Sequence, residues 1–496
     1  MWSHAIDEPG IPADRRLFVR AYAIDVPDGL AWLRLCSRFE DTALVNLFLV
    51  DPDGATRVQH WGLRSGEELV LRHSAEPGDD GLWPGAVPGP LPPGTWRLLV
   101  AAMVRPGSEP RYRIELDGDA GAAPARAAVE TRRVPWIGRP AAPGQDAYDR
   151  YDFHRTAGRG ARWYRGDFHL HTLLSDSKLS AEQLSALAQA RGLEFAVITE
   201  HNTLTTAWCD TPLLVIPGDE FTSTRGHWNS LGTRTFPPLW HGTAPVLESG
   251  DGMEAVLRQQ ARAGALCSLN HPLLPPWAWQ WPDVPMDLFH TLEVQNDPTY
   301  PDNDEATERA LVLWDRLWAL GHRIAGVGGS DVHLLPGESH VPGGPPQEVG
   351  DPATCVWAEE LSPAAILAAV RRGRIYVTRG PALDPRAECG GQRYLPGDHL
   401  PDDGRPVRLR VALDGEPAGG RLRWLENGRE VATQPLAGGR AYEWTTAAAP
   451  GVYRWLRLEV RDVDERLVAF TGPVSVGPRP EPPATRWRDV APASGH

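Results

Sequence analysis

Two histidines, His169 and His171, stand two residues apart in the segment 165–176. If residues 168–172 form a strand, both imidazoles lie on one face, because side chains alternate with period two along a strand. The two rings can then point at one place. A His-x-His pair alone is weak support for a metal site, since histidines are more often surface or core residues. The other ligands have to come from elsewhere in the chain.

Seven acids and histidines further along the chain can complete such a ligand set. They are Asp176, His201, Glu220, His227, His271, Asp331 and His333. Carboxylate and imidazole together suit divalent Zn, Mn or Fe. The nine residues jointly predict a multinuclear metal centre, although a single one of them, His227 above all, can equally be a surface or turn residue.

Strand and helix patterns alternate from residue 163 onward, and the candidate ligands follow the strands. The buried run 195–199 precedes His201, and the run 213–216 precedes Glu220. A β/α barrel brings the carboxyl ends of its parallel strands together on one face, where its active site lies. The spacing therefore predicts a barrel with the ligands at that face. Five histidines do not follow strand ends and are set aside: His154, His241, His290, His322 and His340.

Helices are predicted between these strands from their end signals. Ser180 and Gln183 form a capping box, and Gly192 supplies the stop. A later helix has Ser362 as its N-cap and Pro363 at its first helical position. Both segments carry an apolar stripe at helical spacing, which predicts helices packed on one face.

Short β-rich runs separated by turns occupy the start of the chain and return near its end. Such runs predict β-sandwiches. The expected order is an N-terminal β-sandwich domain over 1–118, a linker over 119–162, the barrel domain over 163–384, a small Ig-like C-terminal β-sandwich over 385–476 and a disordered tail over 477–496.

Composition limits the classes of partner. A net charge of -14 over 496 residues disfavours nucleic acid and anionic membrane, which both call for basic surface. No run reaches the roughly 18 apolar residues of a membrane span, and the first residues lack a secretory signal pattern. The five cysteines include no C-x-x-C pair and predict neither a disulfide framework nor a thiolate zinc site. We expect a cytoplasmic protein that acts on a small-molecule substrate. The sequence does not determine the number of subunits.

Four segments resemble the motifs of the PHP (polymerase and histidinol phosphatase) superfamily of metal-dependent hydrolases. They are residues 166–172 with Ser175 and Asp176, 199–203, 270–272, and 328–333. The wider layout, including residues 226–232, is similar to the CehA/McbA-type metallohydrolases, a branch that includes carbaryl hydrolase. The resemblance implies an α/β fold with a distorted (β/α)7 barrel between the two sandwiches, and two or three divalent ions (Mn, Zn or Fe).

The resemblance also implies how the ligands are shared. One ion would be held by His169, His171, Glu220 and Asp331, a second by Glu220, His227 and His271, and a third by Asp176, His201 and His333. Glu220 would bridge the first two ions, and Glu220 and Asp331 would be catalytic. Glu200 stands where the superfamily motif often has Asp, at a position that is not a ligand in the family pattern.

Hydrolysis follows from such a centre. Two ions that share Glu220 can hold a hydroxide between them and stabilise charge on the electrophile, so that no Ser or Cys nucleophile is required. The superfamily resemblance favours a phosphoesterase acting on a small phosphoester, with Arg225 as a catalytic and substrate-binding phosphate contact. A surface role for Arg225 carries equal weight.

Two alternatives stay open. The subfamily resemblance indicates a carbamate, aryl ester or amide hydrolase, in which Trp277, Trp279 and Trp281 would line an apolar substrate site, with packing between domains as their other possible role. A non-catalytic metal-binding module belongs to another class of function. Its signature would be lost ligands, and none is lost in this sequence.

Overall fold

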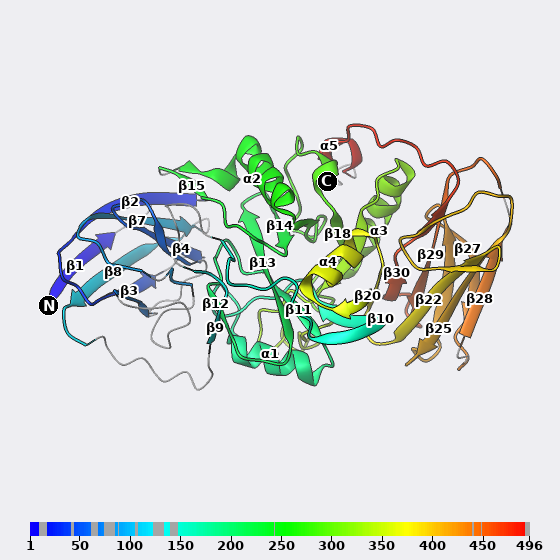
Figure 1. Cartoon of the computed structure of the whole chain (residues 1–496), viewed down its shortest axis with the longest axis horizontal. Helices are drawn as coiled ribbons and strands as arrows, with labels where there is room; N and C mark the ends of the chain where they lie inside the picture. Colours follow the sequence, from blue (N-terminus) through cyan, green and yellow to red (C-terminus); the bar gives the residue numbers. More distant parts are fainter. Residues whose placement is uncertain are drawn as a thin grey trace.

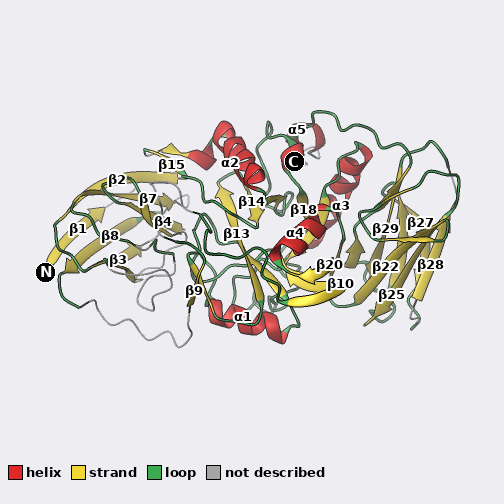
Figure 2. Cartoon of the chain, viewed as in Figure 1, coloured by secondary structure: helices red, strands yellow, loops and turns green. Residues whose placement is uncertain are grey.

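The computed structural model of the chain describes residues 1–8, 17–40, 44–60, 68–73, 85–87, 89–104, 108–122, 133–138, 147–242, 244–438, 441–447 and 449–491. The fold is mixed α/β and mostly sheet. A β-rich N-terminal part, a central part that carries the longer helices and a β-rich C-terminal part follow one another along the longest axis (Figure 1, Figure 2).

Two antiparallel four-stranded sheets make up the N-terminal part. The first has the order β1 (Trp2–Glu8), β8 (Arg111–Asp119), β3 (Trp32–Glu40) and β6 (Glu68–Arg72), and the second has the order β2 (Leu17–Val26), β7 (Gly94–Met103), β4 (Leu44–Val50) and β5 (Thr56–His60). Side chains of both sheets share one apolar core, which includes Ile24, Leu47, Trp96 and Ile114. This shared core agrees with two packed layers, and the assignment as a sandwich stays a prediction.

The central part is built on a mixed sheet. Its strands run in the order β19 (Ala325–Gly329), β18 (Thr291–Asn296), β17 (Leu266–Leu269), β14 (Gly226–Leu231), β13 (Leu214–Ser223), β11 (Phe195–Ile198), β10 (Gly158–Asp167), β20 (Ala353–Leu361) and β21 (Ile375–Thr378). The pairs β10–β11, β11–β13, β17–β18 and β18–β19 are parallel, whereas β14 pairs antiparallel with both β13 and β17. No closed barrel is present among the described strands, and the (β/α)7 barrel that the resemblance implies is not confirmed.

Isolated backbone and side-chain hydrogen bonds nevertheless connect β19, at one end of this strand order, to β20 and to the segment that follows β10. Leu170 and Val332 form an isolated parallel bridge, and the backbone N–H of Asp331 donates to the His169 carbonyl at 2.8 Å. The Thr354 hydroxyl on β20 donates to the Gly328 carbonyl at 2.7 Å. The sheet therefore curls until the end of β19 meets the segment after β10.

Four helices pack beside this sheet: α1 (Ala181–Ala190), α2 (Gly250–Ala263), α3 (Asn303–Ala319) and α4 (Pro363–Arg371). The helix ends predicted from sequence are confirmed, because Ser180 and Gln183 form the capping box of α1 and the Ser362 side chain caps α4 with Pro363 in its first turn. Within the described residues, no helix has the length and apolar character that crossing a membrane requires.

The N-terminal sheets pack against the loops that follow β10 and β11. Leu174 belongs to the N-terminal apolar core, although it lies in the segment after β10. The Gln59 side chain on β5 donates to the backbone carbonyl of Asn202. Loops that carry predicted ligands are thus held from the N-terminal side.

The C-terminal strands continue the central sheet. β21 pairs with β30 (Leu467–Thr471), which leads through β29 (Arg454–Arg461) and β26 (Arg421–Glu426) to β27 (Arg429–Pro435). A second sheet has the order β23 (Gln392–Tyr394), β22 (Ala382–Cys389), β25 (Val407–Asp414) and β28 (Ala441–Thr446). Hydrogen bonding across β21 and β30 therefore joins the two regions that the sequence separates at residue 385.

The segments predicted as a linker and as a disordered tail both make contacts where they are described. In the predicted linker, β9 (Arg133–Pro135) pairs with β12 (Ala207–Cys209), and Trp136 is buried in the central core. In the predicted disordered tail, α5 (Trp487–Val490) buries Trp487 against the same core. Tryptophan side chains provide the apolar area that holds both segments. The domain boundaries themselves stay predictions.

A buried ion network joins α3 to β29. Arg457 lies 2.6 Å from both Asp315 Oδ2 and Glu459 Oε1, and its side chain is 2% exposed. Arg461 pairs with Glu459 and with Glu308 of α3. Burial alone would raise the pKa of Glu459, but the two arginines outweigh it and lower that pKa. Both charges of each pair are therefore present, and they fix α3 against the C-terminal strands.

Replacing Asp315 with alanine is expected to destabilise this junction by about 3 kcal/mol, the lower end for breaking a buried ion pair, because Glu459 still pairs with Arg457. The matched control on the same helix is Asp304→Ala. Asp304 and Arg466 lie 3.5 Å apart and are 62% and 57% exposed, and such a pair contributes about 0–1 kcal/mol. Denaturant unfolding of both variants measures the difference, and equal shifts would contradict the buried network.

Candidate metal centre

The nine side chains predicted as ligands converge at one edge of the central sheet. His169 and His171 follow β10, Asp176 lies in the next loop, His201 follows β11, Glu220 is on β13, His227 is on β14, His271 follows β17, and Asp331 and His333 follow β19. All nine belong to groups whose candidate ligand atoms lie within 4.8 Å of one another. The structure therefore brings together the complete set that the sequence predicts.

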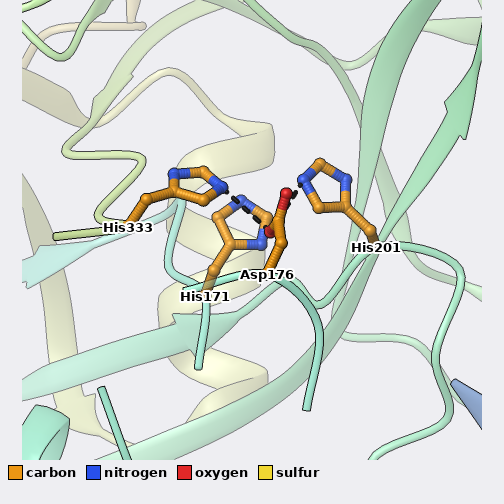
Figure 3. Close-up of side chains that lie close together, drawn as sticks. All are labelled: His171, Asp176, His201 and His333. Atoms are coloured by element: carbon orange, nitrogen blue, oxygen red, sulfur yellow. Dashed lines mark ion pairs between the residues drawn. The ribbon is translucent and has the colours of Figure 1, made fainter. Parts of the chain in front are cut away.

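One group consists of His171, Asp176, His201 and His333. Figure 3 shows the four side chains close together, with dashed lines that join His201 and His333 to the Asp176 carboxylate. Asp176 Oδ1 lies 3.0 Å from His333 Nε2 and 3.5 Å from His201 Nε2. These four residues are the predicted third site with His171 added.

The Glu220 carboxylate belongs to two of the other three groups. Its oxygens lie 3.4 Å from the Nε2 atoms of His169 and His171, 2.8 Å from His201 Nδ1, 3.2 Å from His227 Nδ1 and 3.5 Å from His271 Nε2. Asp331 Oδ1 faces the same pair, 3.3 Å from His169 Nε2 and 3.0 Å from His171 Nε2. Glu220 is 0% exposed.

These separations fit a shared cation. Ligands about 2.0–2.2 Å from a tetrahedral ion lie about 3.3–3.6 Å apart, and octahedral ligands lie somewhat closer. Several of the buried ligand atoms also have no hydrogen-bond partner among the described residues: His169 Nε2, both ring nitrogens of His171, Asp176 Oδ1, Glu220 Oε2, His227 Nδ1, His271 Nδ1 and Asp331 Oδ1. A buried polar atom without a partner costs about 1–3 kcal/mol, so folded proteins contain few of them. Their concentration here indicates that the donors are arranged for metal ions.

Protonation states favour the same conclusion. Burial, together with nearby His201 and His333, lowers the pKa of His171 to about 3, so this imidazole is neutral and can donate a lone pair to a metal. Burial would raise the pKa values of Glu220 and Asp331, but the surrounding histidines outweigh it and hold both well below the usual range. Burial would lower the pKa of His333, whereas Asp176 raises it to about 10. The proton on His333 then occupies a position that a metal ion would take.

Three of the six described non-glycine residues with positive φ lie at the same edge. Asn202, His271 and Asp331 have φ angles of 45°, 24° and 48°, in the left-handed region that side chains rarely adopt. Each such residue costs on the order of 1–3 kcal/mol and persists only where its surroundings fix it. Asn202 is fixed because its side chain donates to the Thr222 carbonyl and accepts from the Thr222 N–H. All three residues are candidate ligands or adjoin one, so this strain lies where the candidate ligands are presented.

Glu293 on β18 orients two ligands, although no sequence pattern gave it a role. His169 Nδ1 lies 2.9 Å from Glu293 Oε1, so the ring N–H can donate to the carboxylate, and the His271 backbone N–H donates to Oε2 at 2.9 Å. A Cβ atom at Gly329 would lie 2.4 Å from His169 Cβ, so a glycine is needed beside this ring. An acid within the buried run 291–294 was the signal that could have identified Glu293.

Asp167 holds three backbone segments together beneath the site. Its carboxylate accepts the N–H groups of His169 and Ser330 at 3.1 Å and of Gly350 at 2.9 Å. Burial raises the pKa of Asp167 to about 6 even though these three donors oppose the shift. The carboxylate ties the His-x-His segment to the segment that carries Asp331.

Glu200 has a similar role for the following loop. Its carboxylate accepts hydrogen bonds from the Thr172 N–H and hydroxyl and from the Ser175 hydroxyl. It is not a member of any candidate metal group among the described residues. Glu200 therefore fixes the turn that leads to Asp176.

A cavity of about 610 Å³ opens over the ligands. Its wall includes the ligands Asp176, His201, His227, His271, Asp331 and His333 and the apolar or aromatic side chains Val104, Leu274, Pro276, Trp277, Tyr300 and Leu334. Val104 comes from the N-terminal part, so that part contributes to the cavity wall. A small molecule with an apolar portion would fit beside the ligands.

Of the predicted substrate-binding residues, the structure places Trp277 alone in this wall. Trp279 and Trp281 are buried in the central core, and the Trp281 indole N–H donates to the Ser223 hydroxyl at 3.1 Å. The Arg225 guanidinium donates to the Gln280 carbonyl and stacks over the Trp281 ring at 4.2 Å. Arg225 is therefore engaged outside the cavity lining.

No protein-family model and no curated protein matches the chain. Among solved structures, the chain is similar to a two-domain protein from Bacteroides vulgatus that contains a predicted PHP-like metal-dependent phosphoesterase, with 16% identity, a TM-score of 0.34 and coverage of 63% of this chain and 96% of that one. It is also similar to an amidohydrolase from Chromobacterium violaceum with bound sulfate and no metal, with 14% identity, a TM-score of 0.24 and coverage of 35% and 89%. Because both TM-scores lie below 0.5, the function has to be inferred from the geometry of the site.

Glu293→Gln is expected to weaken metal affinity by about 10–100-fold, the usual effect of removing a carboxylate that orients a ligand histidine. The amide keeps the shape but presents one acceptor oxygen where the carboxylate accepts from both His169 and the His271 backbone. Competition with a chelator measures the affinity. Glu254→Gln on the outer face of α2 is the control, and equal affinities of the two variants would contradict this role.

Proposed function

We propose that the chain is a metal-dependent hydrolase whose nine ligand residues hold two or three divalent ions of Mn, Zn or Fe. The observation that carries this proposal is the buried Glu220 carboxylate with five imidazole nitrogens within 3.5 Å. The same proposal has two further parts. Glu220 is shared between two ions, and the chain belongs to the CehA/McbA-type branch of the PHP superfamily.

Such ions, when bound, activate water as a nucleophile and stabilise negative charge on the electrophile. The serine hydroxyl in the described cavity wall does not compete for that role. Ser223 donates to the Gly226 carbonyl at 2.8 Å and accepts from Trp281 and the Arg225 N–H, so its hydroxyl is fully used in structure. This supports water rather than serine as the attacking group.

The residues that line the cavity favour a neutral substrate with an apolar or aryl portion, such as a carboxylic ester, carbamate or amide. Trp277 lies beside the ligand His227 with ring centroids 5.7 Å apart, and Leu274 and Pro276 extend the same apolar wall. Among the described residues of the wall there is no arginine or lysine to bind a phosphate. Apolar wall area is what recognition of a neutral substrate requires.

A phosphoesterase is the second candidate. It is the activity that the superfamily resemblance favours, and its support is the ligand set itself, since two or three divalent ions can neutralise the roughly two negative charges of a phosphomonoester. In a phosphoesterase of this kind the ions, rather than Arg225, would hold the phosphate. A non-catalytic metal-binding module stays the third alternative.

Glu220→Gln is expected to lose at least one bound ion per chain and to reduce kcat by more than about 100-fold, because the amide removes the shared negative charge. The flanking β-rich parts are expected to stay folded, since their cores do not include Glu220. Elemental analysis measures the loss of metal, kinetics measures kcat, and circular dichroism tests whether the flanking parts stay folded. A metal-loaded, active variant would refute the shared carboxylate.

Trp277→Ala and Arg225→Ala separate the two substrate classes. For a neutral aryl ester we expect Trp277→Ala to lower kcat/KM about tenfold, equivalent to roughly 1.4 kcal/mol of lost apolar contact, and Arg225→Ala to change it less than about twofold. A panel of aryl esters, carbamates and phosphomonoesters gives the comparison. Faster turnover of phosphomonoesters than of the neutral substrates would contradict the neutral-substrate proposal, and a large loss of that turnover in Arg225→Ala would in addition restore Arg225 as a phosphate contact.

A further inference from the structure

One histidine outside the nine ligands lies in the cavity wall. His340 and Asp297 line the cavity together with Asp331 and His333. His340 Nε2 lies 2.7 Å from Asp297 Oδ2. Neither residue belongs to a candidate metal group among the described residues. This imidazole and carboxylate therefore form a pair that faces the cavity and that the metal centre does not use.

The Asp297 carboxylate is held in a fixed position. Oδ1 accepts from the Thr299 N–H at 3.0 Å and from the Thr299 hydroxyl at 2.6 Å, and Oδ2 accepts from Gln347 Nε2 at 2.8 Å. The side chain is almost completely buried. A carboxylate with all these donors in place can orient an imidazole, as the acid of a catalytic triad does.

Gln347 connects this pair to the metal-ligand segment. Its Nε2 also donates to the Asp331 carbonyl at 2.8 Å, and its Oε1 accepts the His333 N–H at 2.9 Å. Asp297 Oδ2 and the Asp331 carbonyl thus share one donor. The His340 ring is connected to the segment that carries Asp331 through three hydrogen bonds.

The second ring nitrogen of His340 is available to a substrate. Nε2 faces Asp297, the Tyr300 ring packs edge-on with centroids 5.1 Å apart, and Nδ1 has no hydrogen bond to any described residue. The His340 side chain is 17% exposed. The other histidines in the described wall are all ligand candidates: His201, His227, His271 and His333. A ligand nitrogen cannot also carry a transferable proton, so His340 is the imidazole in this wall that can exchange one.

We infer that His340, oriented by Asp297, is the general acid that protonates the leaving group during hydrolysis. This inference rests on the proposed function and adds a catalytic residue to it. The oxygen of water forms the new bond to the electrophilic centre, and the bond from that centre to the leaving oxygen breaks with its electron pair on that oxygen. The proton from His340 goes to the leaving oxygen, which departs as an alcohol. The proton that water gives up restores His340, so the reaction balances.

The dependence of rate on the leaving group tests this assignment. His340→Gln should lower kcat/KM for alkyl esters, whose alkoxide leaves poorly, by about 100-fold or more, within the usual range for a general acid. For 4-nitrophenyl esters of the same acid, whose leaving group needs no proton, the loss should be below about fivefold. A role in packing or in binding the common acyl part would lower both rates equally.

Controls separate the possible failures. Metal content of His340→Gln should equal that of the unmodified protein, because His340 is not a ligand, and the exposed His241→Gln should change neither rate. Asp297→Asn should show the same selectivity with a smaller amplitude, since it acts through His340. Equal losses on both esters, no loss on either, or loss of metal would overturn the inference while leaving the hydrolase proposal standing. A metal-loaded, unmodified protein that cleaves no ester, carbamate, amide or phosphoester would overturn both.

Discussion

A carboxylate without exposed surface, enclosed by five imidazoles, is the constraint on which the rest of this structure depends. Glu220 is removed from water on β13, and burial of an ionised carboxylate is costly unless positive charge accompanies it. Nearby histidines hold its pKa well below the usual range. Protons on some of the histidines, or divalent ions among all of them, can supply the positive charge. The unpaired ring nitrogens and carboxylate oxygens fit the ions better, because protonated and hydrogen-bonded rings would have used those atoms.

Much of the fold is arranged to keep this charged group in place. Three further buried acids lie around it, and each accepts hydrogen bonds from segments that carry ligands: Asp167, Glu200 and Glu293. Each of them accepts at least one backbone N–H group, so they fix where the chain turns, and Glu293 also holds the His169 ring through Nδ1. The N-terminal part reaches the same loops through Gln59 and Leu174. The C-terminal part is fixed to α3 by the buried network around Arg457.

The sequence was sufficient to predict which nine side chains lie together, because strand ends can be recognised in it. A buried apolar run followed by an acid or histidine recurs along the chain, and the structure brings all nine residues together. Contacts between distant segments were not visible: Asp297 meets His340 only because two loops fold over the same cavity. Side-chain direction in a loop was not visible either, so spacing could not tell that Trp277 faces the cavity while Trp279 packs inward. The antiparallel strand β14, which separates the parallel pairs, is likewise an arrangement that hydrophobic periodicity does not encode.

The central claim is tested most directly by elemental analysis of the purified chain after expression in medium that contains Mn, Zn and Fe. We predict at least two divalent ions per chain that survive gel filtration and that a strong chelator removes. We also expect the chain without metal to unfold at lower denaturant concentration, since ions that bind the folded state stabilise it. Fewer than one ion per chain, with unchanged stability after chelation, would contradict the claim that these nine side chains form a metal centre.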